Sequence, residues 1–165
     1  MAFDKISGLP EWNDDDFHDR DEEGEQWKPN PTRDACKEMY QQWQQVMTVL
    51  KGALETMKTD TGEEKFPAEY YEDHQAMLLG DACQVAVKIK SSEAGLYMIR
   101  MENASIIRKN AQFISSSMLT MIEEGVIEEA HGRVIRDEID KFRILFRQWV
   151  STFEKDEFED EWGLF

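Results

Sequence analysis

Polar residues at apolar positions are the first places in this sequence where chemistry could be carried. His74 and Asp81 are separated by seven residues, as are Asn103 and Asn110, and each pair lies among apolar residues spaced by three and four. Such steps return to one face of an α-helix, so these side chains are expected to face the interior. Counting from the expected turns places them at neighbouring levels, beside two charged residues. We call this predicted set the polar column: His74, Asp81, Glu102, Asn103, Arg108 and Asn110.

Two interpretations of the polar column are open. In the first, its members satisfy one another's hydrogen bonds, and the asparagines fix which helix packs where. In the second, they form a ligand- or metal-binding site in the bundle core, with or without enzymatic activity, around His74, Asp81, Glu102 and Asn110.

The spacing does not favour a metal. His74 and Asp81 are two helical turns apart, roughly 10 Å along the axis, so one ion cannot bind both directly. The Glu-x-x-His motif of di-iron bundles occurs once, at residues 128–131, where a helix is expected to begin. We therefore predict no metal site and no cofactor.

The sequence also lacks a catalytic motif. Residues 115–117 are three serines without a nucleophile motif around them, and the three histidines fall in three separate segments. Neither a glycine-rich phosphate loop nor G-x-S-x-G occurs. We predict that the protein is not an enzyme.

The elements that would position these residues are predicted to be helices. All four prolines precede residue 68, and the β-branched alternation of strands is missing. Apolar residues recur at bundle-type spacing in four segments joined by short loops. We predict an all-α fold, an antiparallel up-and-down four-helix bundle over residues 32–153, with helices at about 32–58, 67–90, 93–124 and 127–153.

The first and third helices carry predicted interior stripes of different character. The stripe of the first helix is apolar throughout: Cys36, Met39, Trp43, Val46, Leu50, Ala53 and Met57. The stripe of the third helix includes polar residues: Leu96, Ile99, Asn103, Ile106, Asn110, Phe113, Ser117 and Met121. The asparagines are therefore the residues that need a specific partner.

Local signals set the expected helix ends. Thr32 would cap the first helix, Pro67 fits the first turn of the second, and Gly125 would follow the third.

The joint at residues 88–95 leaves two arrangements open. Ser91 or Ser92 could cap a new helix, but one continuous helix over residues 67–124 also fits. We expect a turn, because so long a helix would need a partner chain to cover its apolar stripe.

The net charge of -16 is concentrated at the two ends of the chain. Residues 1–31 carry ten acidic and three basic residues, residues 151–165 carry six and one, and residues 32–150 carry nineteen and fifteen. We therefore distinguish an acidic N-terminal extension, residues 1–31, and an acidic C-terminal tail, residues 154–165. Direct binding to nucleic acid is not expected of such a chain.

Both acidic ends contain large apolar residues, which plain solvated tails lack. They are Trp12, Phe17 and Trp27 at one end and Phe158, Trp162, Leu164 and Phe165 at the other. We predict that these residues bind a protein partner with a basic groove, the acids speeding encounter and the aromatic rings holding. Packing of the ends onto the bundle and disorder are the alternatives.

The last six residues, DEWGLF, add a carboxylate directly after Leu164 and Phe165. In composition this end resembles the acidic, Phe-terminated tails of bacterial and phage single-stranded DNA-binding proteins. The resemblance implies recruitment of partner proteins, and it does not extend to the bundle.

The compartment is inferred from the cysteines and the hydropathy. Cys36 and Cys83 form no framework of disulfides and no zinc motif, the start of the chain does not resemble a signal peptide, and no apolar run is long enough for a membrane span. We predict a cytoplasmic, non-enzymatic interaction or adaptor protein. A monomer and a homodimer are both open alternatives. An acidic mimic of nucleic acid is a further alternative, although it would need carboxylates on a rigid face.

Overall fold

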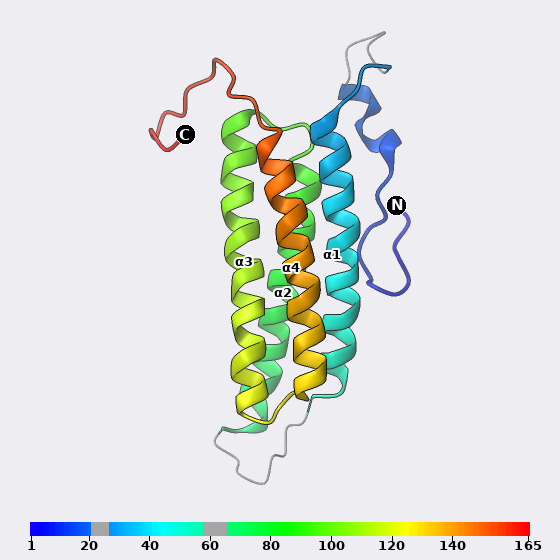
Figure 1. Cartoon of the computed structure of the whole chain (residues 1–165), viewed down its shortest axis with the longest axis vertical. Helices are drawn as coiled ribbons and strands as arrows, with labels where there is room; N and C mark the ends of the chain where they lie inside the picture. Colours follow the sequence, from blue (N-terminus) through cyan, green and yellow to red (C-terminus); the bar gives the residue numbers. More distant parts are fainter. Residues whose placement is uncertain (21–26, 58–65) are drawn as a thin grey trace.

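Four amphipathic stretches form four long helices. The computed structural model describes residues 1–20, 27–57 and 66–165, with α1 (Pro31–Glu55), α2 (Ala68–Ser91), α3 (Tyr97–Glu123), α4 (Glu129–Ser151) and a preceding 3₁₀ helix, η1 (Asp14–Arg20). The four α-helices run side by side and alternate in direction (Figure 1). The described residues contain no strand, only an isolated bridge between Phe3 and Pro10. The predicted up-and-down four-helix bundle is confirmed.

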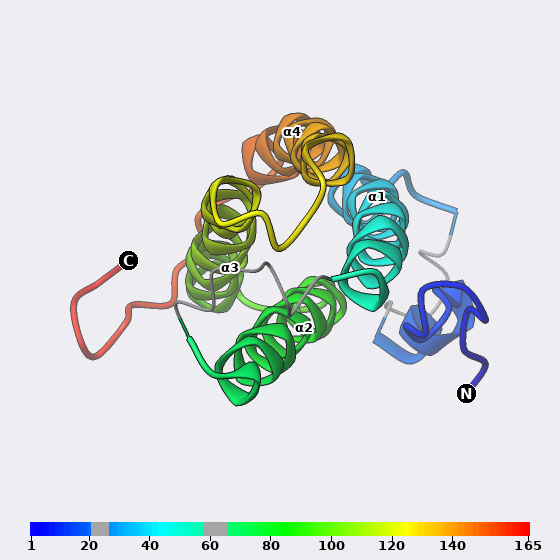
Figure 2. The ribbon, with the colours of Figure 1, turned by 90° about the horizontal axis from the view of Figure 1, so that it is seen from below.

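Each helix packs against its neighbours in chain order, and α4 closes the ring against α1 (Figure 2). The start of α1 and the end of α4 therefore lie at the same end of the bundle, from which both terminal segments leave (Figure 1). We call this the terminal end.

The α2–α3 joint is a turn, as predicted, over residues 92–96. The expectation that Ser91 or Ser92 caps the next helix was wrong. Ser92 instead closes α2, because its hydroxyl donates to the Lys88 carbonyl at 2.6 Å.

The start of α1 corrects another sequence prediction. Asn30, not Thr32, caps the helix, and its Oδ1 accepts a hydrogen bond from the Arg33 N–H at 3.0 Å. The reason is Pro31, which lacks an N–H and fits the first helical position, so that the helix begins before Thr32. Pro67 likewise lies just before α2 rather than in its first turn. The predicted end of the first helix, residue 58, lies outside the described residues.

The core lies between the four helices and is centred on large side chains. Six of the seven predicted stripe residues of α1 are buried, and Met57 packs against them. Trp43 is fully buried, its Nε1–H donates to the Ala82 carbonyl at 2.8 Å, and its ring lies 4.7 Å from that of Phe142 between centroids. One indole thus joins α1, α2 and α4.

The buried face of α3 is displaced from the predicted stripe. Ile99 and Phe113 are exposed, whereas the buried face runs through small and branched apolar residues. They are Ala104, Ile107, Ala111, Ile114 and Met118. A stripe built on steps of three and four places a helix face only to within about one residue, because 3.5 and 3.6 residues per turn diverge along a long helix. The asparagines stay buried because they lie where both faces overlap.

Two glycines shape the connection and the contact between α3 and α4. Gly125 follows α3 with φ +72°, the left-handed conformation expected of a residue just past a helix end. Gly132 is buried in the first turns of α4, where an added Cβ would lie 2.5 Å from Ile122 Cδ1 and 2.8 Å from its Cγ1. Any larger residue at 132 would therefore force the Ile122 side chain to move.

None of the helices in the described part of the chain is both long and apolar enough to cross a membrane.

A pair of glycine substitutions tests this packing. Gly52 lies in α1 with open space around a built Cβ, so Gly52→Ala should raise the free energy of unfolding by about 0.5–1 kcal/mol through helix propensity. Gly132→Ala should lower the free energy of unfolding by about 1 kcal/mol, because the cost of overpacking outweighs the gain in helix propensity. Urea denaturation of both variants provides the comparison, and an equal rise in both would contradict the packing described.

Candidate functional site

The polar column is only partly assembled in the structure. Asn103 and Asn110 are buried, and His74 and Asp81 are half-buried. Glu102 and Arg108 are exposed, so their prediction as members of a buried set was wrong. Both residues lie on the outer side of α3, because the buried face of this helix is displaced from the predicted stripe. The six residues therefore do not converge on one interior cavity.

Asn110 has a partner of the kind that the first interpretation requires. Its Nδ2 donates to Oε1 of Gln84 on α2 at 2.5 Å. The hydrogen bond links α2 to α3, and it would be lost if one helix shifted along the other.

His74 lies among rings rather than among ligands. Its centroid is 6.1 Å from that of Tyr70 and 6.4 Å from that of Phe113, and Nε2 is buried without a hydrogen-bond partner in the described part of the chain. Within those same residues, no three His, Cys, Asp or Glu side chains are grouped as a metal site would need.

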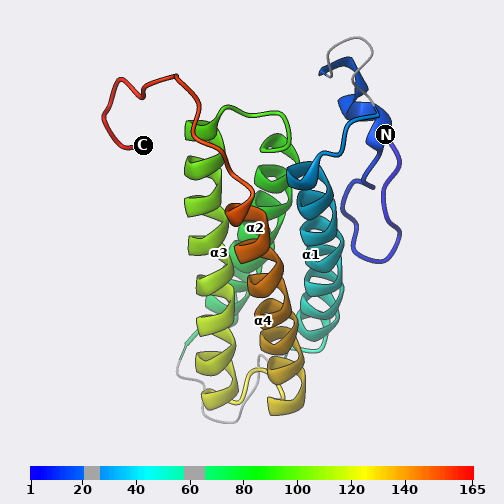
Figure 3. The ribbon, with the colours of Figure 1, turned by 45° about the horizontal axis from the view of Figure 1, so that its top comes forward.

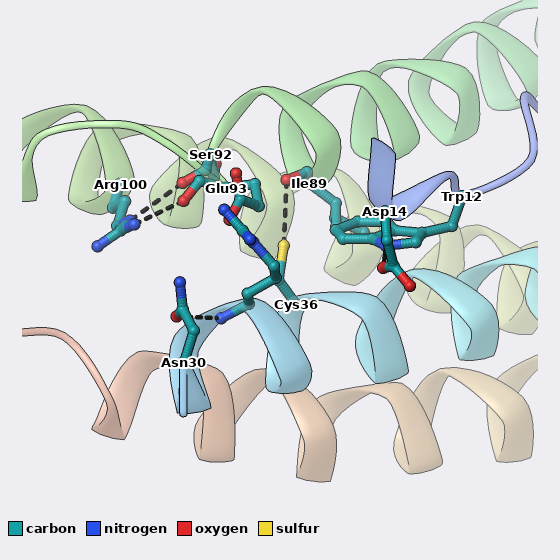
Figure 4. Close-up of polar contacts among 9 residues, drawn as sticks. Trp12, Asp14, Asn30, Cys36, Ile89, Ser92, Glu93 and Arg100 are labelled. Atoms are coloured by element: carbon teal, nitrogen blue, oxygen red, sulfur yellow. Dashed lines mark hydrogen bonds and ion pairs between the residues drawn. The ribbon is translucent and has the colours of Figure 1, made fainter. Parts of the chain in front are cut away.

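A buried ionic cluster at the terminal end was not found from the sequence. Glu93, in the α2–α3 turn, is 2% exposed, and its Oε1 accepts from Arg33 Nε on α1 at 2.5 Å. Arg100, on α3, donates from Nε to the Ser92 carbonyl at 3.0 Å and from Nη2 to the Glu93 carbonyl at 2.6 Å (Figure 4). We call Arg33, Glu93 and Arg100 the terminal-end cluster. It links α1, the α2–α3 turn and α3.

The cluster has a weak sequence signal. Residues 88–95 read as a turn, in which a glutamate is ordinarily a solvated residue. Arg33 is 60 positions away from Glu93, so no local spacing connects the two. Only helix packing brings them together.

Cys36 lies beside the terminal-end cluster, where its thiol is unreactive. Its Sγ donates to the Ile89 carbonyl at 3.4 Å (Figure 4). Burial, and secondarily the negative charge of Glu93, raises the pKa of this thiol to about 12. Cys83 is exposed, and both cysteines are free thiols.

The first part of the N-terminal extension packs on the bundle. Residues 1–20 lie beside α1 in both side views (Figures 1 and 3). Leu9 is part of the core, and Phe17 is buried. The Tyr40 hydroxyl donates a hydrogen bond to the Pro10 carbonyl. The ring of Trp12 lies 4.9 Å from that of Phe17 and 5.7 Å from that of Tyr40 between centroids.

Lysines on the bundle offset part of the negative charge of residues 1–20. Lys37 Nζ lies 2.9 Å from Asp14 Oδ2, and Lys90 Nζ lies 3.8 Å from Asp16 Oδ2. Trp12 and Phe17, two of the predicted partner-binding residues, thus contact this chain itself. Trp27 differs, being 77% exposed.

The C-terminal tail leaves the bundle and presents its apolar residues. Trp162 is 88% exposed and Leu164 is 74% exposed, and Phe158 is also exposed, whereas Phe165 is half-buried. The tail passes over the start of α3 and lies on the outer side of that helix (Figures 1 and 2).

Aspartates give the tail its local order. Asp156 Oδ2 accepts a hydrogen bond from the Tyr97 N–H at 2.9 Å, which satisfies a free donor in the first turn of α3. Asp160 accepts from the N–H groups of Trp162 at 3.2 Å and Leu164 at 2.8 Å, with Gly163 at φ +69° between them. The tail therefore ends in a turn that displays Trp162 and Leu164.

A groove between the middle parts of α3 and α4 is the second feature that the sequence did not reveal. It encloses about 270 Å³, and its lining is mainly apolar. Its floor contains Ala111, Phe142 and Phe146, and the charged residues of its rim are Arg108, Arg143, Arg147 and Asp140. We call it the α3–α4 groove. The grouping of Arg143 and Arg147 of α4 with Arg108 of α3 follows from helix packing alone.

Neither the protein-family models nor the curated proteins nor the solved structures give a match to this chain.

Removal of the buried carboxylate tests the terminal-end cluster. Glu93→Ala should lower the free energy of unfolding by about 3 kcal/mol, because it removes a buried carboxylate that is paired with the largely buried Arg33. Asp140→Ala is the matched control, since it also removes a carboxylate paired with an arginine, but both groups are exposed and the cost should stay below about 1 kcal/mol. Similar losses in urea denaturation for both variants would contradict the role given to Glu93.

The two thiols should react at different rates. Thiolates are the reactive species, so the exposed Cys83 should label quickly with a disulfide reagent near pH 8, and Cys36 only after unfolding. Ellman's assay in native and denaturing buffer measures this, with Cys83→Ser as the control that should lose the fast phase. Two fast thiols in the native protein would show that Cys36 is not buried.

Proposed function

We propose that this protein is a non-enzymatic interaction or adaptor protein that binds a protein partner through its C-terminal tail. The supporting observation is the exposure of Trp162, Leu164 and Phe158 within a segment dominated by carboxylates. Large apolar side chains held at a surface by local turns are typical anchors of protein interfaces. The bundle serves as the rigid support of this tail.

The partner is expected to be a protein with a basic groove that has apolar pockets. Residues 151–165 carry six acidic residues against one lysine, so the tail attracts positive surfaces and accelerates encounter with them. The same charge disfavours nucleic acid and anionic membranes as direct partners.

Two of the residues predicted to bind a partner pack against this chain instead. Trp12 and Phe17 contact α1 and each other, so they have little surface left for a partner. Trp27 remains a candidate because it is exposed. We do not propose the alternative ligand site around His74, Asp81, Glu102 and Asn110, since Glu102 lies at the surface. The cytoplasm is proposed as the compartment because both cysteines are unpaired.

Truncation of the tail anchors tests this function. Trp162→Ala combined with Leu164→Ala should weaken capture of the partner at least about tenfold, since each anchor of this type contributes on the order of 2 kcal/mol. Full-length tagged protein would capture partners from cell extract, and the affinity would then be measured with the purified partner.

Ile144→Ala is the matched control, because Ile144 is an exposed apolar residue on α4, outside the tail. Its capture should equal that of the unmodified chain, and Trp27→Ala reports whether the N-terminal extension contributes. If the double tail variant captures the same proteins with the same affinity, the tail is not the binding site.

A further inference from the structure

The α3–α4 groove is a positively charged feature on a strongly negative chain. Asp140 also lines the groove and lies 3.4 Å from Arg143, so it offsets one of the three arginine charges, and the lining stays net positive. Arg108 and Arg147 take part in no ion pair within the described residues. The rim therefore presents arginine side chains to an incoming acidic group.

The size of the groove limits what it can hold. Its volume of about 270 Å³ lies just below the range of small-molecule pockets, roughly 300–1,000 Å³. The floor is apolar, with Phe142 and Phe146 beneath the arginine rim. Such a groove suits one or two apolar side chains from a segment with flanking carboxylates.

The C-terminal tail of this same chain has that chemistry. Trp162 and Leu164 project from the turn held by Asp160, and Glu159 and Glu161 adjoin them. Arginine matches carboxylates in paired hydrogen bonds and stacks on aromatic rings, so the rim can hold both parts of the tail.

We propose that the α3–α4 groove binds the C-terminal tail of a second copy of this chain. The inference rests on the proposed function of the tail and names its partner. It assigns to one protein both halves of the contact, the acidic aromatic segment and the basic apolar groove.

The chain's own tail is directed away from its own groove. Asp156 is bonded to the first turn of α3, and the following residues lie on the outer side of that helix, away from α4 (Figure 2). A second copy can present its tail to the groove without breaking this bond. Exchange of tails between two copies makes two identical contacts, and it closes as a symmetric dimer.

Charge reversal at the rim, with a matched control, tests the exchange. Arg143→Glu alters the rim, whereas Arg133→Glu makes the same charge change on α4 outside the groove, and each arginine has one exposed carboxylate partner. Native mass spectrometry and sedimentation of the full chain should find dimers for the unmodified protein and Arg133→Glu. For Arg143→Glu and for the Trp162→Ala, Leu164→Ala double variant, dimerisation should weaken about tenfold or more.

Mixing the two defective variants gives the sharper test. The Arg143→Glu copy still has an intact tail, and the double tail variant still has an intact groove. A mixed dimer, recognised by its mass, should therefore form more readily than either variant's own dimer. Circular dichroism of each variant confirms that the bundle is folded.

Other outcomes would overturn the inference. An unmodified chain that stays monomeric, or a dimer unaffected by both variants, excludes tail exchange. Concentration-independent protection of residues 157–165 from hydrogen exchange, lost in Arg143→Glu, would instead place the tail in its own groove. If the chain is monomeric but tail-dependent capture of another protein persists, the proposed function stands and this inference fails; if the tail variant changes neither property, both fail.

Discussion

The buried carboxylate of Glu93 is the constraint on which the terminal end depends. It accepts a hydrogen bond from Arg33 of α1, and the carbonyls of Ser92 and Glu93 accept hydrogen bonds from Arg100 of α3. A buried ion pair adds little net stability compared with apolar packing, but any arrangement that separates its partners is strongly penalised. The cluster therefore favours one relative position of α1 and the α2–α3 turn over its neighbours. It also fixes the end of the bundle from which both terminal segments leave.

Two extensions of similar composition have different structures for physical reasons. The N-terminal extension brings Leu9 and Phe17 to apolar surface on α1, and Lys37 and Lys90 offset the charge of its aspartates. The tail has one anchoring contact to another element, from Asp156 to the start of α3, among the hydrogen bonds of the described residues. Its remaining bonds are local, so Trp162 and Leu164 stay in solvent. The acidic residues do not decide the difference; the surface within reach of the aromatic residues does.

Charge within the bundle is separated by face as well as by sequence. The central segment is nearly neutral as a whole, yet packing groups Arg108 with Arg143 and Arg147 around an apolar floor. A chain with acidic ends and a basic groove has complementary surfaces on one molecule. Self-association between such surfaces would need no second protein, and the rigid helices would keep the groove preformed, which limits the ordering cost to the tail.

The sequence by itself determined the fold class, because proline placement and spacing of apolar residues are local properties that each helix carries alone. It also favoured a turn within residues 88–95, since a continuous helix would have left its stripe uncovered, and the structure has this turn at residues 92–96. It identified Asn103 and Asn110 as interior residues, and the structure buries both. Tertiary structure alone decided that Glu102 and Arg108 face outward, because the rotation of a long helix is set by its neighbours. It alone decided that Glu93 meets Arg33 and that three arginines share one groove. It also decided that Trp12 and Phe17 pack against the bundle while Trp162 stays exposed. Each of these outcomes depends on residues distant in the chain.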